Sequence, residues 1–344
     1  VRNSVADNAL KTAIKSKPAP LYDKKFASRI TTGNFEDDFA NIKDYDWVIE
    51  VVVERLDIKQ QVFEKVDKFR REGTLVTSNT SGIPIHMMLE GRSDDFKKHF
   101  CGTHFFNPPR YLRLLEVIPT PETSQEVIDF FMHYGDVYLG KQTVLAKDTP
   151  AFIANRVGVY AMAKIYQLTT DIGLRIEEVD RLTGPAIGRP KTGTFRLGDL
   201  VGHDTAAKVI QGIKQNAPND EQAGAFEIPN YLQFLLDNNF LGNKSGQGFY
   251  KKTKEKDEKG KSVILALNLE TLEYEKQVKP DLPSLKTAKQ IDDLDKRVQA
   301  MFNADDKGGE LIRRSLAGLF AYVSNRIPEI SDNLYSIDDA LRAG

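Results

Sequence analysis

The chain contains a single cysteine, Cys101, among its 344 residues. One cysteine excludes an intrachain disulfide and any zinc site built on several cysteines, as is typical of proteins from a reducing cytoplasm. No two histidines have the spacing of zinc ligands, so we predict no metal site. Cys101 itself stands in an apolar run, which favours a small buried residue over a nucleophile.

Long apolar runs and basic blocks are missing as well. No stretch approaches the roughly 20 apolar residues that cross a bilayer, and the first residues show no signal-peptide pattern. We therefore predict no membrane span and a cytoplasmic location. The formal net charge is -1, with Lys and Arg spread along the chain. Nucleic acid is therefore not an expected partner.

A phosphate-binding glycine loop is the third absence. Neither G-x-G-x-x-G nor G-x-x-x-x-G-K-[ST] occurs in the sequence. If the first domain binds a dinucleotide, its first strand, its glycine turn and the acidic residue that contacts the ribose must precede Val1. We therefore expect an incomplete Rossmann domain that, on its own, binds its cofactor poorly.

Apolar patterning predicts the fold class. Over residues 1–147, apolar runs of strand length alternate with helical periodicity, and residues 47–53 have the pattern of a strand buried on both faces. This alternation predicts a doubly wound, mostly parallel α/β domain. Residues 148–250 have helical periodicity, which predicts an all-helical second domain. Residues 251–286 predict a charged, solvated turn and a β-hairpin, and residues 287–344 predict part of a further helical domain.

The strongest candidates for chemistry are His104 and Glu116. His104 lies in an aromatic turn braced by prolines, and Glu116 lies at the end of an apolar strand. Histidine titrates near neutral pH, and a buried carboxylate on its other ring nitrogen would fix its tautomer and stabilise its charged form. A histidine in such a turn is also often only structural. The other histidines lack this context and are expected on the surface or in ordinary packing: His86, His99, His133 and His203.

Four polar positions each allow two interpretations. Glu54 follows the predicted buried strand and precedes a helix that carries Lys59, where such sheets bind ligands, but it could equally be a solvated residue. Asn79 and Ser81 belong to a polar turn in which helix capping explains some of the side chains, though not all of them. Asn155 interrupts an apolar helix, either as a packing residue bonded to backbone or as a hydrogen-bond donor in a site.

Five segments together resemble the 3-hydroxyacyl-CoA dehydrogenase family. They occur in family order and at family-like spacing, and the resemblance covers about residues 1–250. Residues 287–344 resemble the start of the second helical repeat of multifunctional fatty-acid-oxidation proteins. The hairpin and residues 17–20 resemble the bacterial type, in which the dehydrogenase precedes an enoyl-CoA hydratase. The five segments are residues 78–81, 102–108, 115–118, 147–157 and 246–250.

The resemblance implies NAD-dependent oxidation of 3-hydroxyacyl-CoA to 3-oxoacyl-CoA in fatty acid β-oxidation. It implies that His104 removes the 3-hydroxyl proton while hydride passes to NAD, and that Glu116 orients and stabilises the imidazolium. Ser81 and Asn155 would hydrogen-bond the reacting oxygen. The residues implied on the cofactor side are Glu54, Lys59, Asn79 and Asn107.

The resemblance also implies partners. Besides the 3-hydroxyacyl-CoA substrate, these are a hydratase domain in the full-length chain and either a second copy of the chain or a thiolase. Two alternatives remain open from the residues themselves. The first is a dehydrogenase for a sugar or another hydroxy acid, and the second is a non-catalytic structural or assembly module that retains the fold.

Overall fold

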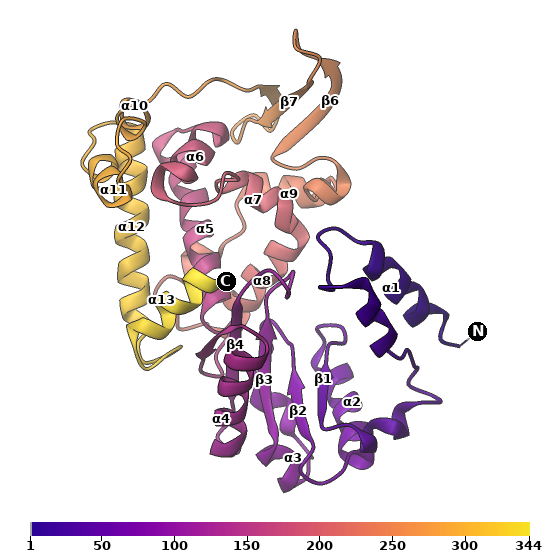
Figure 1. Cartoon of the computed structure of the whole chain (residues 1–344). Helices are drawn as coiled ribbons and strands as arrows, with labels where there is room; N and C mark the ends of the chain where they lie inside the picture. Colours follow the sequence, from indigo (N-terminus) through magenta and orange to yellow (C-terminus); the bar gives the residue numbers. More distant parts are fainter. Residues whose placement is uncertain (1) are drawn as a thin grey trace. The chain divides into compact units, whose positions relative to one another are not determined.

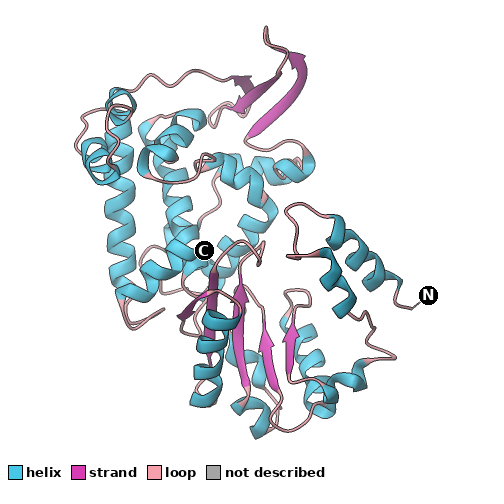
Figure 2. Cartoon of the chain, in the orientation of Figure 1, coloured by secondary structure: helices cyan, strands magenta, loops and turns pink. Residues whose placement is uncertain are grey.

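The computed structural model describes residues 2–344. The chain divides into two compact units (Figure 1), of which the first comprises Val1–Asn155 and Arg326–Gly344 and the second comprises Arg156–Asn325. The first unit contains the mostly parallel sheet, and the second is mainly helical with one small sheet (Figure 2). The predicted fold class, an α/β domain with a parallel sheet followed by a helical domain, is confirmed.

The sheet of the first unit has five strands in the order β1-β2-β3-β4-β5. All neighbouring strands are parallel except β3 and β4, which are antiparallel. The antiparallel pair matters for the site, because residues that face each other across it have side chains on the same side of the sheet. The strands are β1 (Trp47–Glu50), β2 (Leu75–Ser78), β3 (Phe100–Phe105), β4 (Leu114–Pro119) and β5 (Gln142–Leu145).

Helices cover this sheet with apolar faces. From α4, Val127 and Phe131 pack with Cys101 and Leu115 in one buried cluster. Cys101 is therefore a buried packing residue, and burial raises the pKa of its thiol far above the usual range. The helices of the first unit are α1 (Ser4–Lys15), α2 (Leu56–Phe69), α3 (Asp94–Lys98), α4 (Gln125–His133) and α13 (Leu334–Ala343).

The first strand is shorter and more exposed than its apolar pattern predicts. It ends at Glu50, and the side chains of Val51 and Val53 beyond it are 68% and 60% exposed. The prediction of a strand buried on both faces over residues 47–53 is therefore wrong. β1 pairs with β2 on one side only, so within the described residues no strand pairs with its outer edge. A run of valines in the sequence does not show how many neighbouring strands a strand has.

The long helix α5 (Ala154–Ile172) begins with the last two residues of the first segment of unit one and otherwise belongs to the second unit. Its small antiparallel sheet contains the predicted hairpin, formed by β7 (Ser262–Leu267) and β8 (Tyr274–Lys276), and adds β6 (Tyr250–Lys256) as a third strand. Much of the charged run expected to be a turn is therefore strand, with its charged side chains directed to solvent. The remaining helices are α6 (Ile176–Leu182), α7 (Phe195–Val201), α8 (His203–Asn216), α9 (Asn230–Asp237), α10 (Pro283–Ala288), α11 (Leu294–Phe302) and α12 (Lys307–Asn325).

The C-terminal segment differs from the expected separate piece over residues 287–344. Its helices up to Asn325 belong to the second unit, whereas Arg326–Gly344 belong to the first unit. There α13 packs on β4 and β5, and the Arg113 N–H donates to the carbonyl of Ala343 at 3.1 Å. Helical periodicity shows that each helix has an apolar face, but it does not identify the surface that this face covers.

Candidate active site

His104 and Glu116 face each other on adjacent antiparallel strands. The register pairs them directly across β3 and β4, so their side chains emerge on the same side of the sheet. Nδ1 of His104 lies 2.7 Å from Oε2 of Glu116, and the side chains are 5% and 0% exposed. His104 and Glu116 are twelve residues apart in the sequence, and the hairpin of β3 and β4 brings them directly opposite each other.

The second carboxylate oxygen of Glu116 is also occupied. Oε1 accepts hydrogen bonds from the backbone N–H groups of Ile153 at 3.1 Å and Ala154 at 2.8 Å, at the start of α5. Ala151 and Phe152, just before, have left-handed φ angles of 63° and 53°. Such conformations are costly for residues other than glycine and often occur at functional sites. They turn the chain so that both N–H groups meet one carboxylate, which fixes the orientation of Glu116.

The other ring nitrogen of His104 is available for chemistry. If Nδ1 donates its proton to Glu116, Nε2 carries the lone pair and can accept a proton. No described residue forms a hydrogen bond with Nε2. The rings of Phe106 and Phe152 pack against the imidazole, with centroids 4.4 Å and 5.6 Å away. These contacts hold the ring in place while leaving one nitrogen unbonded, which is the arrangement of a general base.

The turn that carries Ser81 is held by Glu54. Oε1 of Glu54 accepts from the Thr80 hydroxyl at 2.5 Å, the Ser81 N–H at 3.0 Å and the Gly82 N–H at 3.3 Å. Burial alone would raise the pKa of Glu54, but the Thr80 hydroxyl, the Lys59 charge and the Ser81 N–H outweigh it and lower that pKa. Glu54 is therefore a multiple acceptor rather than a freely solvated residue.

Asn79, Asn155 and Asn107 occupy three different positions around this turn. Oδ1 of Asn79 accepts from the Phe105 N–H at 2.9 Å, which ties the end of β2 to β3 next to His104. Nδ2 of Asn155 lies 3.5 Å from the carbonyl oxygen of Ser81. Asn107 is exposed on the loop after β3. The structure thus brings Asn155 and Ser81 together.

Lys59 is enclosed by carboxylates. Its Nζ lies 2.9 Å and 3.0 Å from the two oxygens of Glu50 and 3.3 Å from Oε2 of Glu54. The side chains of Lys59 and Glu50 are each 1% exposed. Lys59 was expected on the cofactor side from the family resemblance, whereas its contacts in the structure are with these two glutamates.

Sequence reasoning missed two contacts that shape the loops around the site. Asp148 accepts from the N–H groups of Ile85 at 2.6 Å and His86 at 2.8 Å, and it pairs with Nδ1 of His86 at 2.6 Å. Lys141, which is largely buried, donates to the carbonyls of Pro109 and Leu112 on the loop after His104. Both partners are distant in sequence, so no local pattern could have found them.

His203 also has a carboxylate partner that the sequence did not reveal. It is fully buried, and its Nε2 lies 2.9 Å from Oδ1 of Asp199. Asp199 accepts in addition from the N–H groups of Phe249 at 2.7 Å and Tyr250 at 2.9 Å. The pair therefore anchors the 246–250 segment inside the second unit, and the expectation that His203 has no carboxylate context is wrong.

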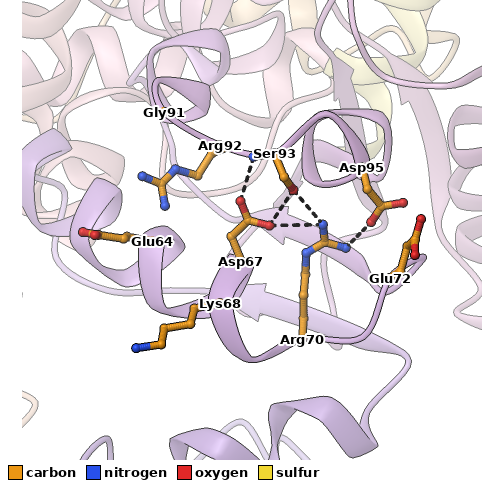
Figure 3. Close-up of a pocket in the computed structure, with 9 residues that line it drawn as sticks. All are labelled: Glu64, Asp67, Lys68, Arg70, Glu72, Gly91, Arg92, Ser93 and Asp95. Atoms are coloured by element: carbon orange, nitrogen blue, oxygen red, sulfur yellow. Dashed lines mark hydrogen bonds and ion pairs between the residues drawn. The ribbon is translucent and has the colours of Figure 1, made fainter.

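A charged hollow lies at the opposite ends of the strands (Figure 3). It encloses about 470 Å³ and is lined by residues that precede β2 and β3. In it, the Arg70 guanidinium bridges Asp67 at 3.2 Å and Asp95 at 2.6 Å, and the Ser93 hydroxyl donates to Asp67 at 2.7 Å. These side chains bond to one another and link the end of α2 to the start of α3. The hollow is therefore lined by a structural ion-pair cluster.

Two further properties concern the described residues as a whole. Among residues 2–344, no group of three or more His, Cys, Asp or Glu side chains is arranged to hold a metal ion. Over the same residues, no helix combines the length and apolar character that crossing a membrane requires.

Comparison with known protein families identifies the chain. Residues 2–149 match the family model described as 3-hydroxyacyl-CoA dehydrogenase, NAD binding domain. Residues 152–252 match the model described as 3-hydroxyacyl-CoA dehydrogenase, C-terminal domain. A mostly parallel α/β sheet of this kind is the general fold of nucleotide-binding dehydrogenase domains. Within that class, the chain belongs to the 3-hydroxyacyl-CoA dehydrogenase family.

Individual relatives agree with this assignment. The chain is 44% identical over 344 residues to a probable 3-hydroxyacyl-CoA dehydrogenase of Bacillus subtilis, of which it spans 43%. It is also 45% identical over 254 residues to a probable 3-hydroxyacyl-CoA dehydrogenase of Deinococcus radiodurans. That match covers 74% of this chain and 72% of the relative. Among solved structures, FadB2 of M. tuberculosis superposes with a TM-score of 0.61 and 27% identity, over 73% of this chain and 85% of that chain.

Proposed function

We propose that the protein oxidises 3-hydroxyacyl-CoA to 3-oxoacyl-CoA with NAD. The observation that carries the proposal is the buried contact of 2.7 Å between Nδ1 of His104 and Oε2 of Glu116, with Nε2 of His104 not bonded to any described residue. Family membership supplies the substrate class, and the match to an NAD binding domain supplies the cofactor.

In this mechanism, Nε2 of His104 accepts the proton of the 3-hydroxyl group. NAD, when bound, accepts the hydride that leaves C3. The imidazolium that forms is stabilised by the Glu116 carboxylate, whose orientation is fixed by its two backbone donors. The reacting oxygen gains alkoxide character in the transition state, so donors directed at it lower the barrier. Ser81 and Asn155 are the proposed donors.

The residues that follow β1, β2 and β3 at their carboxyl ends fit an NAD molecule chemically. Such sheets bind dinucleotides beyond the carboxyl ends of their strands. The side chain of Glu54 is 46% exposed, so it can still accept from a hydroxyl group of the cofactor. Asn79 and Asn107 carry amides, which can pair with a carboxamide or a ribose hydroxyl. We propose that these three residues hold the cofactor directly.

A reduction assay tests the proposal. The complete protein is given acetoacetyl-CoA and NADH, and the loss of NADH is followed by its absorbance. General-base catalysis contributes about 10²- to 10⁴-fold, so we expect His104→Ala to lower kcat by that amount. His133→Ala, at the exposed end of α4, serves as the control and should leave kcat unchanged. Unchanged turnover in His104→Ala would remove this mechanism.

We further propose that the reaction is a step of fatty acid β-oxidation in a multifunctional protein. The support is a relative described as a putative fatty acid oxidation complex trifunctional enzyme of Rickettsia felis, 32% identical over 343 residues. A hydratase domain, a thiolase and a second copy of the chain are the proposed partners. If a hydratase is attached, the complete protein should form NADH from a 2-enoyl-CoA and NAD without any added enzyme. No NADH under these conditions would contradict the attached hydratase.

A further inference from the structure

The loop that joins β3 to β4 carries two residues beside the candidate site. Phe106 packs against the His104 imidazole with ring centroids 4.4 Å apart, and Asn107, which follows it, is exposed. The loop spans residues 106–113, and none of its residues is buried. Such surface loops are mobile unless other contacts hold them. The contacts that fix the course of this loop therefore also fix the position of Asn107.

Lys141, just before β5, is bonded to this loop. Its Nζ donates to the carbonyl of Pro109 and, at 2.8 Å, to that of Leu112. The residue is only 7% exposed, and burial lowers the pKa of Lys141. Among residues 2–344, no Asp or Glu side chain forms an ion pair with its ammonium group. Two loop carbonyls are therefore the polar partners of a buried charge.

A buried ammonium group without a carboxylate partner contributes little to the stability of a fold. Taking a charge out of water costs free energy, and hydrogen bonds to carbonyl groups offset only part of that cost. Replacing buried charges by apolar side chains of similar volume is often neutral or stabilising. The course that the two bonds impose on the loop therefore explains Lys141 better than stability does.

The loop sequence carries the effect of Lys141 to Asn107. Asn107 is followed by Pro108 and Pro109. A proline ring fixes φ, and the residue before a proline is restricted to extended conformations, so this piece of chain is stiff. At its other end, the Phe105 N–H is bonded to the segment after β2. Asn107 therefore lies between two fixed points, of which Lys141 provides one.

We propose that Lys141 is a positioning residue for cofactor binding, which holds the loop in the course that places Asn107 against NAD. This inference rests on the proposed function, in which Asn107 is one of the residues that hold the cofactor. Lys141 itself contacts neither cofactor nor substrate. His104 and Glu116 are fixed by the strand register and by two backbone donors, none of which involves Lys141. Loss of Lys141 should therefore weaken NADH binding more than it lowers kcat.

The variant Lys141→Met removes both bonds to the loop and keeps a side chain of similar length. Lys98→Met, at the exposed end of α3, is the matched control. Asn107→Ala and the double variant Lys141→Met with Asn107→Ala complete a double-mutant cycle, which shows whether the two residues act through each other. Three quantities are measured on the complete protein: the Kd of NADH by fluorescence, kcat with acetoacetyl-CoA at saturating NADH, and the denaturant midpoint of unfolding.

We expect Lys141→Met to raise the Kd of NADH about tenfold, because the cofactor must then order the loop when it binds. In the Asn107→Ala background the same change should raise the Kd less than about twofold, because the loop no longer carries the amide that it positions. We expect kcat at saturating NADH to fall less than about threefold. The midpoint of unfolding should be no lower than in the wild type. Lys98→Met should match the wild type throughout.

Three results would overturn the proposal. An unchanged Kd of NADH in Lys141→Met would show that binding does not need the loop to be held. An equal rise with and without the Asn107 amide would show that Lys141 affects the cofactor by another route. A lower midpoint of unfolding, with kcat and affinity reduced in parallel, would make Lys141 an ordinary residue of the folded core.

Failure of the proposed function gives a different result. A wild-type protein that binds NADH but does not reduce acetoacetyl-CoA would refute the proposed reaction. The Kd of NADH needs no turnover, so the double-mutant cycle would then still decide whether Lys141 positions Asn107. A wild-type protein that does not bind NADH would refute both the cofactor contact of Asn107 and the role of Lys141.

Discussion

At the scale of single residues, the candidate chemistry depends on which nitrogen of His104 carries a proton. Glu116 accepts from two backbone N–H groups through one oxygen and meets Nδ1 of His104 through the other. An ionised carboxylate can only accept hydrogen bonds. The pair therefore favours the tautomer with the proton on Nδ1 and the lone pair on Nε2.

Glu116→Gln should reverse this tautomer. The amide oxygen will face the Ile153 and Ala154 N–H groups, which leaves the amide NH₂ to donate to Nδ1 of His104, so that the proton moves to Nε2. We expect kcat with acetoacetyl-CoA to fall about 10²- to 10⁴-fold while the protein stays folded by circular dichroism. Glu126→Gln, on an exposed turn of α4, is the control. Turnover within twofold of the wild type would contradict the role given to Glu116.

A second residue-scale prediction concerns Asp180. It is buried in the second unit and accepts from the N–H groups of Phe195 and Arg196 and from the Tyr250 hydroxyl. Burial raises the pKa of Asp180 from 3.8 to about 6, although these three donors act in the opposite direction. Between these two values the folded protein keeps the proton that the unfolded chain has lost, so raising the pH favours unfolding.

The measurement compares the wild type with Asp180→Asn by chemical denaturation from about pH 4 to about pH 7. Each pKa unit corresponds to about 1.4 kcal/mol, so the free energy of unfolding of the wild type should fall relative to the variant by about 3 kcal/mol as pH rises through this window. If the difference in free energy of unfolding between the two proteins does not change with pH, the pKa of Asp180 is the same in the folded and unfolded chain, which contradicts the prediction.

At the scale of elements, two long helices of the second unit are joined by a buried polar cluster. Nη2 of Arg156, on α5, lies 2.7 Å from Oδ2 of Asp220, which also accepts from the Tyr322 hydroxyl on α12 at 2.8 Å. Tyr322 stacks on Tyr160 with ring centroids 3.8 Å apart. Neither charged side chain is exposed, so this ion pair is removed from solvent.

Removing one charge from this cluster should therefore be costly. We expect Asp220→Ala to lower the free energy of unfolding by about 3–5 kcal/mol, because the buried Arg156 guanidinium loses this buried carboxylate. Asp171→Ala is the control, since Asp171 pairs at 3.2 Å with Arg314 between the same two helices but on the surface. That exposed pair should be worth about 0–1 kcal/mol. Equal losses in the two variants, measured by denaturant unfolding, would contradict this assignment.

At the scale of the whole molecule, the chain leaves the first unit at Asn155 and returns to it at Arg326. The returning segment places α13 against β4, the strand that carries Glu116, and against its neighbour β5. Ile337 on α13 is 1% exposed, whereas Tyr335 on the same helix is 81% exposed. Stability of the sheet that carries the His–Glu pair therefore depends on residues that follow the entire second unit in sequence.

This connection predicts an asymmetric response to truncating side chains on α13. Ile337→Ala should lower the free energy of unfolding of the first unit by about 2–5 kcal/mol, since it opens a cavity in a packed interface. Tyr335→Ala should change it by less than about 0.5 kcal/mol. Hydrogen exchange of the backbone amides of β4 and β5 measures the loss of stability in the strands that α13 contacts. Unaltered exchange in Ile337→Ala would show that α13 does not support the sheet.

Sequence reasoning identified much of this protein and failed in specific places. Local patterns predicted the strand–helix alternation and the helical second domain, and short motifs indicated the family. The contacts of Lys59 with Glu50 and Glu54, of His86 with Asp148, and of α13 with the sheet were not. Each of these contacts joins residues that no periodicity relates, because their approach depends on how the elements pack.

The sequence by itself therefore determined the alternation of strands and helices in the first domain and the helical character of the second, and it named His104 and Glu116 as the residues to examine. Only the tertiary structure decided that they touch, because the register of the antiparallel strands β3 and β4 sets which side chains face each other. It also decided that β1 is a short edge strand and that the Lys59 ammonium is enclosed by carboxylates. Burial and hydrogen-bond partners are properties of neighbours in space, and a linear pattern records only neighbours along the chain.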